Sequence, residues 1–337
     1  MLVLASLFHC LDPVLTIAAG LSGTKSPFLT PLGKEQEARA AHAKFEVRQS
    51  DFLTLANAFE AYRAAFRERK EQAFCVQHFL GRVTLREMSD LKCQYLSLLI
   101  DMGLVARPPH FGTRGGGVPS YGAMEEWVAI PEATTKTKAG GGVNAEAGNT
   151  NLVLAVVAAG LYPHVVYADT SSSGSGSGKG GRPSFYHGPA GKPNTQVYLH
   201  PSSVNHGLSR FSSPWLVFHE KFHTTRAYVS PTSVVSPYAL LLFGGPLAVD
   251  HLANRAVVEE WIEFSCPART AVLFREMRRR LNEVLEDMIQ RPLVVRAASS
   301  AGEAHEAVVD AIISLLKSEE VKAAWVPGSK DDPEAKA

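Results

Sequence analysis

The residues His219, Glu220 and His223 have the H-E-x-x-H spacing of zinc-dependent hydrolases. On a helix, the two imidazoles would share one face and bind one Zn²⁺, while the glutamate would activate a water molecule. A third ligand would be needed downstream, where Glu259 and Glu260 lie at a suitable distance. This spacing makes a zinc peptidase the first hypothesis to test.

The sequence that surrounds this motif favours a different structure. It reads WLVFHEKFHTTRAYV, is rich in β-branched and aromatic residues and has no helix-start signal. In a strand, residues four apart lie about 13 Å from one another, which is too far for one metal ion. We therefore expect His219 and His223 to be strand residues, and we keep the zinc peptidase as an alternative.

Two other segments resemble phosphate-binding sites. Residues 174–180 read GSGSGKG, but Lys179 is followed by glycine rather than by the hydroxyl residue that a phosphate loop uses to bind Mg²⁺. The basic stretch at 274–281, FREMRRRL, could touch phosphate. We expect instead that its arginines lie on the solvated side of an amphipathic helix whose core residues include Leu273 and Leu281.

Composition restricts the class of protein. The 337 residues are enough for two domains, and a net charge of +1 means that any nucleic-acid surface must be a local patch. Four cysteines without a C-x-x-C pair predict neither a zinc knuckle nor a disulfide framework, and favour a reducing, intracellular location. The apolar N-terminus is interrupted by His9, Asp12 and Pro13, so we expect a buried helical pair rather than a signal peptide. No segment reaches the roughly 20 apolar residues of a membrane span, so no membrane partner is expected.

Periodicity predicts an α+β protein with a helical first part. Asp12 and Pro13 read as an N-cap and a first helical position. Short runs punctuated by Pro, Gly and Ser, namely QVYLH, WLVFHEKF, TTRAYVS and YALLLFGG, predict the strands of a small antiparallel barrel. The expected segments are a helical domain (1–106), a flexible Gly-rich insertion (107–150), the barrel domain (151–292) with a disordered loop (169–195) and a closing helix (270–290), a helical extension (293–325) and a charged tail (326–337).

Several segments, in a fixed order, resemble the C-terminal half of the DEAH/RHA-family RNA helicases. The resemblance covers most of the chain outside the two Gly-rich segments. It rests on CLDPVLTIAAGLS with PFLTPLG, SDFLTLANAFEAYR, FLGRVTLREMSDLKCQY, AVVAAGLYPHVV, VYLHPSSVN, SPYALLLFGG and the segment that begins WIEFSCPARTAVLF. It implies a helical, ratchet-like (helicase-associated) bundle, followed by an OB-fold barrel and C-terminal closing helices.

The resemblance also implies a role in holding RNA. In the family these domains form one wall of a channel through which ATP-driven RecA-like domains pull single-stranded RNA 3′ to 5′, and the contacts are largely indifferent to base identity. Loop hydroxyls and basic side chains commonly position phosphates. The residues we expect to face RNA, chosen by residue type and position, are His200, Ser202, Ser203, Lys221, Thr225 and Arg226 in the barrel, and Arg82, Thr84 and Lys92 at the ratchet helix.

The sequence also departs from a whole helicase. It contains neither G-x-x-x-x-G-K-[ST] nor Asp-Glu-Ala-His, and it starts where the family's winged helix would end. We therefore expect this chain to bind no cofactor and to hydrolyse no ATP alone, with ATP and Mg²⁺ held by the parent enzyme. Its expected partners are single-stranded or structured RNA and the RecA-like and winged-helix domains, in the cytoplasm, the nucleus or both. The open alternative is a protein-interaction module that docks on RecA-like domains without binding RNA.

Overall fold

The computed structural model describes the whole chain except residues 24, 106–141, 170–182, 189–194, 292–299 and 319–337. The described residues form two compact units. The first comprises the described residues of Met1–Val47, Asp51–Val153 and Val284–Glu306, and the second comprises those of Arg48–Ser50, Leu154–Glu283 and Ala307–Ala337. Within the described ranges, no helix is long and apolar enough to cross a membrane.

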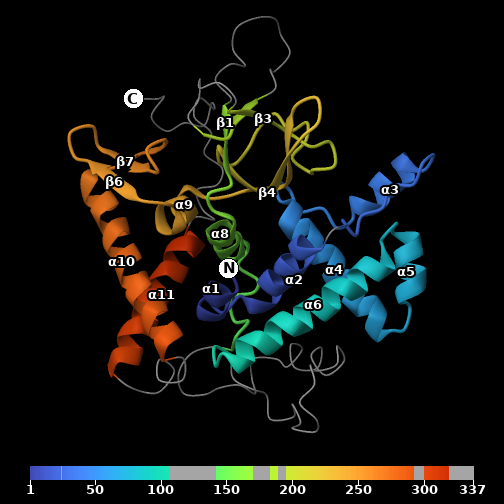
Figure 1. The fold of residues 1–337 in the computed structure, drawn as a ribbon, viewed down its shortest axis with the longest axis horizontal. Helices are drawn as coiled ribbons and strands as arrows, with labels where there is room; N and C mark the ends of the chain where they lie inside the picture. The colour runs from blue at the N-terminus through green and yellow to red at the C-terminus, as the bar shows by residue number, and fades with distance from the viewer. Residues whose placement is uncertain (24, 106–141, 170–182, 189–194, 292–299, 319–337) are drawn as a thin grey trace, which may run out of the picture. The chain divides into compact units, whose positions relative to one another are not determined.

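The first unit is a helical bundle (Figure 1). Helix α2 packs against α4 and α6, and one core cluster includes Phe59, Tyr62, Leu85 and Met88. Apolar residues at helical spacing bring these side chains to one face of each helix. The helices from the N-terminus are α1 (Leu2–Leu7), α2 (Leu11–Ser22), α3 (Glu35–His42), α4 (Asp51–Arg67), α5 (Glu71–Gln77) and α6 (Arg82–Asp101).

The start of α2 differs from the prediction. The helix begins at Leu11 with Cys10 as its N-cap, so Asp12 lies inside the first turn and is not the cap. Residues 142–149, which belong to the expected flexible insertion, lie against this end of the helix. The Leu11 amide donates to the carbonyl oxygen of Val143, and the Asp12 amide donates to Asn144 Oδ1 at 2.8 Å. The first turn is thus satisfied by a segment far away in the sequence.

The second unit contains a closed five-stranded barrel, so the expected α+β class is confirmed. Its core includes Val166, Val197, Leu216 and Phe218. The neighbours in the barrel are β1-β2-β3-β5-β4, and all pairings are antiparallel except that of β3 with β5, so the expectation of a fully antiparallel barrel is wrong at that ladder. The strands are β1 (Val165–Asp169), β2 (Ser184–Tyr186), β3 (Gln196–Leu199), β4 (Trp215–His223) and β5 (Ala227–Val234).

The run YALLLFGG, expected to be a strand, is helical. Helix α9 (Pro237–Phe243) follows Ser236, whose hydroxyl oxygen accepts hydrogen bonds from the amides of Tyr238 and Ala239 at 2.9 and 3.3 Å. A continuous apolar run carries no periodicity that distinguishes a helix from a strand. The serine cap and the proline at the first helical position decide between them.

A three-stranded antiparallel sheet, which the sequence did not predict, follows α9. It consists of β6 (Leu247–Asp250), β7 (Arg255–Val258) and β8 (Ile262–Ser265). Helix α8 (Thr150–Leu161) precedes the barrel along the chain. Helices α10 (Ala268–Gln290) and α11 (Ser300–Ser318) cover most of the segments expected to be the closing helix and the helical extension. Most of the 107–150 insertion, most of the 169–195 loop with its GSGSGKG sequence, and the 326–337 tail lie outside the described residues.

Candidate nucleic-acid interface

The H-E-x-x-H motif lies on a strand. Residues 219–223 form the second half of β4, as expected from the local composition. Glu259, a candidate third zinc ligand, instead accepts a hydrogen bond from the Tyr162 hydroxyl at 2.5 Å. Among the residues that the structure describes, no group of three His, Cys, Asp or Glu side chains could hold a metal ion. The zinc-peptidase alternative therefore has no structural support.

The same half of β4 contributes to an aromatic row across three strands. Tyr198 on β3 is paired with Tyr228 on β5, and Tyr228 is paired with Phe222 on β4. Ring centroids are 6.1 Å apart in each of these two pairs, and Phe222 and Tyr228 are stacked with an interplanar angle of 23°. Tyr198 alternates with the core residues Val197 and Leu199, so its side chain points to the outside of the barrel. The row is thus a half-buried outer surface.

The side chains of Arg226 and His200 lie against the rings of this row. The guanidinium carbon of Arg226 lies 4.7 Å from the centroid of the Tyr198 ring, within the range of a cation–π interaction. The His200 ring lies 5.5 Å from Phe222 and 6.1 Å from Tyr228. We call Tyr198, His200, Phe222, Arg226 and Tyr228 the aromatic patch. It offers ring faces and a positive charge on one side of the barrel.

The remaining barrel residues expected at RNA are divided between the surface and the interior. Lys221, next to Phe222 on β4, and Thr225, in the turn between β4 and β5, are exposed. The exposed Ser202 hydroxyl lies 2.6 Å from His200 Nδ1 and therefore helps to orient that ring.

Ser203 is buried and not on the surface. Its hydroxyl lies 2.9 Å from Thr232 Oγ1 and accepts from the Asn205 amide at 3.1 Å. The Asn205 side chain in turn donates to Thr232 at 3.0 Å. The expectation that Ser203 faces RNA is corrected, because its hydroxyl holds the loop after β3 against β5.

Lys92 on α6 is also buried, with 1% of its side chain exposed. Its ammonium group lies 2.6 Å from Asp12 and donates to Thr16 Oγ1 at 2.9 Å. Arg63, also buried, contacts the same Asp12 carboxylate at 3.0 Å. The expectation that Lys92 contacts RNA is corrected, because a buried charge is retained only where it is paired.

The other two candidates at the ratchet helix lie in its first turn. Arg82 is half-buried and lies 3.5 Å from Glu71, and Arg86 also forms an ion pair with this carboxylate. Thr84 is half-buried beside Gly81. The structure thus brings His200, Ser202 and Arg226 together in one place, with Lys221 and Thr225 on the same hairpin, and it keeps Arg82 and Thr84 in a separate unit.

Sequence reasoning missed the three rings of the aromatic patch, Tyr198, Phe222 and Tyr228. A signal for two of them was present: Phe222 and Tyr228 flank the short polar segment HTTRA, which is typical of cross-strand partners in a hairpin. The pairing with Tyr198 had no such signal, because a parallel ladder joins strands that are distant along the chain.

Three family descriptions match successive parts of this chain. Residues 1–55 match the helicase associated domain (HA2), ratchet-like. Residues 153–247 match an oligonucleotide/oligosaccharide-binding (OB)-fold, the segment that contains the barrel. Residues 254–318 match the C-terminal domain in RNA helicases.

Curated relatives match over nearly the whole chain. The ATP-dependent DNA/RNA helicase DHX36 of Homo sapiens is 34% identical over 326 residues, which are 95% of this chain and 28% of the relative. The DExH-box ATP-dependent RNA helicase DExH1 of Arabidopsis thaliana is 33% identical over 321 residues, again 95% of this chain and 27% of the relative. The chain spans about a quarter of the length of these relatives.

Proposed function

This chain belongs to the DEAH-box RNA helicases and comprises their C-terminal region, and on that premise we propose that it holds single-stranded RNA through the aromatic patch of its barrel. In this proposal it is an accessory, strand-holding module of an ATP-dependent 3′–5′ helicase. Its other partners would be the RecA-like and winged-helix domains. ATP and Mg²⁺ would be bound by the RecA-like domains and not by this chain.

The observation that carries the proposal is the aromatic row with a guanidinium over one end. Bases stack on aromatic side chains regardless of sequence, and each stacked base contributes about 1–3 kcal/mol to binding. Arg226 is an exposed cation at this row that can neutralise a backbone phosphate. Lys221 is also exposed, but it is paired with the core residue Val229 and therefore lies on the opposite face of β4 from Phe222. The only carboxylate on β4, Glu220, is 71% exposed and lies 3.7 Å from His219, so it offsets part of this charge.

The charged part of the patch is tested by measuring the affinity of the full chain for an oligouridylate as a function of salt. Each phosphate contact to single-stranded nucleic acid contributes about 0.7 to the slope of log K against log salt. We expect Arg226→Ala to weaken binding several-fold at about 100 mM salt and to lower the slope by about 0.7. Lys221→Ala, on the opposite face of β4 from Phe222, should have the smaller effect. Arg255→Ala is the matched control, because this arginine of β7 is already paired with Asp250 and Glu263.

The aromatic part is tested separately with Tyr198→Leu, which keeps an apolar side chain but removes the ring. We expect a loss of about 1–3 kcal/mol that is the same at low and high salt. A wild-type chain that binds no RNA, or a slope near zero, would contradict the proposal. Binding to separate RecA-like domains without any affinity for RNA would establish the protein-interaction alternative instead.

A further inference from the structure

The arginines of α10 are in two different electrostatic environments. Arg279 and Arg280 both form ion pairs with Glu276 and Glu283, at distances that include 2.5 Å for Arg279–Glu276 and 3.1 Å for Arg280–Glu276. Their positive charge is therefore largely neutralised by carboxylates on the same helix. The sequence predicts a solvated position for the whole basic run; Arg275 is exposed as expected, whereas Arg278 is half-buried.

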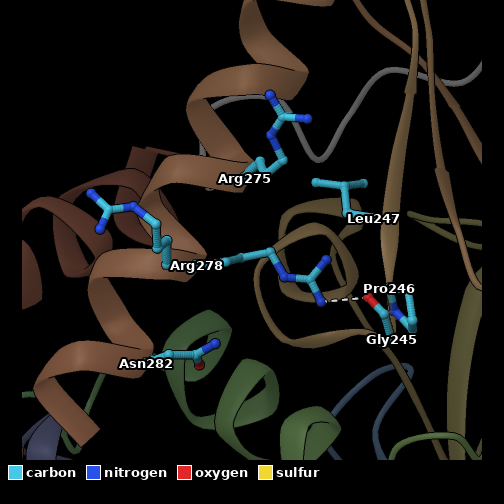
Figure 2. A pocket seen from close by; sticks show the side chains of 7 residues that line it. Gly245, Pro246, Leu247, Arg275, Arg278 and Asn282 are labelled. Atoms are coloured by element: carbon cyan, nitrogen blue, oxygen red, sulfur yellow. Dashed lines mark hydrogen bonds between the residues drawn. The ribbon is translucent and has the colours of Figure 1, made fainter. Parts of the chain in front are cut away.

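Arg275, Arg278 and Asn282 lie at i, i+3 and i+7 and so share one face of α10. Figure 2 shows this face against the backbone of Gly245, Pro246 and Leu247, with Arg278 reaching across to it. The three side chains, together with Arg279 and these backbone residues, line an open pocket of about 390 Å³. Polar and apolar groups contribute about equally to its wall, the polar part coming from backbone, guanidinium and amide groups.

The charges of Arg275 and Arg278, unlike that of Arg279, are not neutralised by any carboxylate within the described residues. Arg278 donates to the carbonyl oxygens of Gly244 and Gly245, the latter at 2.5 Å. Its Nη1 is buried and has no hydrogen-bond partner among the described residues, and burial lowers the pKa of its guanidinium. Arg275 is exposed, and no acidic side chain in the described ranges lies within ion-pair distance of it. Leu273, expected in the core, is 62% exposed, whereas Leu281 is buried as expected.

We propose that the pocket formed by Arg275, Arg278 and Asn282 against Gly245–Leu247 binds a phosphate of the RNA backbone, as a second contact in addition to the aromatic patch. This inference rests on the proposed function. Arginine and asparagine side chains are common donors to phosphate oxygens. The planar guanidinium group can donate two parallel hydrogen bonds to one phosphate. Arg278, already fixed by two carbonyl groups, supplies a positive field without the entropy cost of ordering its long side chain. Arg275 supplies the direct contact.

The lining favours a nucleic-acid phosphate over an acidic protein segment. A peptide bound at a specific site gains most of its affinity from apolar side chains seated in buried pockets. This pocket is open, and Pro246 and Leu247 are the apolar residues of its lining, so it offers no enclosed apolar seat for a peptide side chain. A phosphodiester strand gains affinity from each phosphate independently and needs no deep cavity.

The experiment compares Arg275→Ala with Arg280→Ala in the full chain, using a fluorescein-labelled oligouridylate between about 50 and 200 mM salt. The two arginines lie on one helix, but Arg280 is ion-paired with Glu276 and Glu283 and does not line the pocket. We expect Arg275→Ala to weaken RNA binding several-fold and to lower the salt slope by about 0.7, and Arg280→Ala to change the affinity by less than about twofold. Asn282→Asp places a carboxylate beside Arg278 and should weaken binding at least as much as Arg275→Ala. Thermal unfolding checks that each variant remains folded.

Equal affinities for the Arg275→Ala and Arg280→Ala variants would overturn the phosphate site. If those two affinities are equal while Tyr198→Leu and Arg226→Ala weaken binding in the same assay, the pocket inference fails and the proposed function stands. If the wild-type chain binds no RNA, both fail together. A polyglutamate peptide that binds wild type but not Arg275→Ala, while RNA affinity is unchanged by that substitution, would assign the pocket to an acidic protein segment and overturn the inference.

Discussion

Asp12 shows how a residue that looks like a helix cap can become the centre of a buried ion cluster. Its carboxylate contacts both Lys92 and Arg63, and the Lys92 ammonium also lies 5.2 Å from the centre of the Phe59 ring. Burial alone would raise the pKa of Asp12, but the charges and hydrogen bonds of Lys92 and Arg63 outweigh it and lower the pKa. The cluster joins α2, α4 and α6, which are the helices that carry the first core.

We expect Asp12→Asn to destabilise the chain by about 3 kcal/mol at pH 7, because it leaves two buried cations without their carboxylate. A carboxyl group whose pKa is lowered on folding stabilises the folded state at pH values above its unfolded pKa of about 3.9. That stabilisation is lost as pH falls through the lower, folded pKa. The difference between wild type and Asp12→Asn, measured by urea unfolding, should therefore be full at pH 7 and shrink as the pH falls below about 3.9.

The matched control for this substitution is Asp90→Asn, since Asp90 is exposed on α6. It should change the free energy of unfolding by no more than about 0.5 kcal/mol at neutral pH. If the free energies of unfolding of wild type and Asp12→Asn differ by the same amount at every pH, the role given to the Asp12 charge is refuted.

At the scale of elements, the turn after α9 depends on Gly244. A Cβ atom added there would lie 2.5 Å from the Leu240 carbonyl oxygen and 2.8 Å from a Val258 methyl group. The Gly244 amide donates to that same Leu240 oxygen at 2.8 Å, and its own carbonyl accepts from Arg278. The contact with backbone cannot be relieved by a side-chain rotation, so this turn requires glycine.

We expect Gly244→Ala to destabilise the chain by about 1–3 kcal/mol, the usual cost of overpacking. It should also weaken RNA binding if the neighbouring pocket contacts phosphate. Gly148→Ala provides the control, because a Cβ atom added at Gly148 would have no described atom within 4 Å and the φ of this residue is not positive. Equal unfolding midpoints in urea for the two variants would show that the turn after α9 tolerates a side chain.

Sequence patterns were sufficient to predict the secondary structure of some elements but not of others. The β4 strand was predicted correctly despite its H-E-x-x-H motif, because β-branched and aromatic residues fill a strand surface. Helix α9 was missed, because four consecutive buried residues, Ala239 to Leu242, carry no period. The local signal for a helix is the Ser-Pro pair before them, which provides an N-cap and a proline at the first helical position.

At the scale of the whole molecule, a ligand that binds only the folded chain stabilises it. An oligouridylate at about 100 times its Kd should raise the free energy of unfolding by about 2.7 kcal/mol. ATP with Mg²⁺ should leave the unfolding temperature unchanged, because we propose that the nucleotide is bound outside this chain. The measurement is thermal unfolding with each ligand separately, and stabilisation by ATP with Mg²⁺ but not by RNA would contradict both halves of this prediction.

Amphipathic periods, the strand composition of 215–229 and the order of the family segments were enough to predict an α+β chain with a helical part, a barrel and an RNA-helicase lineage. The periods and the strand composition are local, since each depends on residues within one or two turns or one hairpin, whereas the helicase lineage came from the resemblance of segments along the whole chain. The site residues depended on tertiary structure. Lys92 and Ser203 have side chains that suit RNA, yet the fold buries both among partners from distant segments. Tyr198 and Tyr228 become neighbours only through a parallel ladder, and Arg275 differs from Arg279 only in the carboxylates that the folded helix places beside each. Burial and charge pairing are non-local properties, and they decide which basic and aromatic side chains remain available to a ligand.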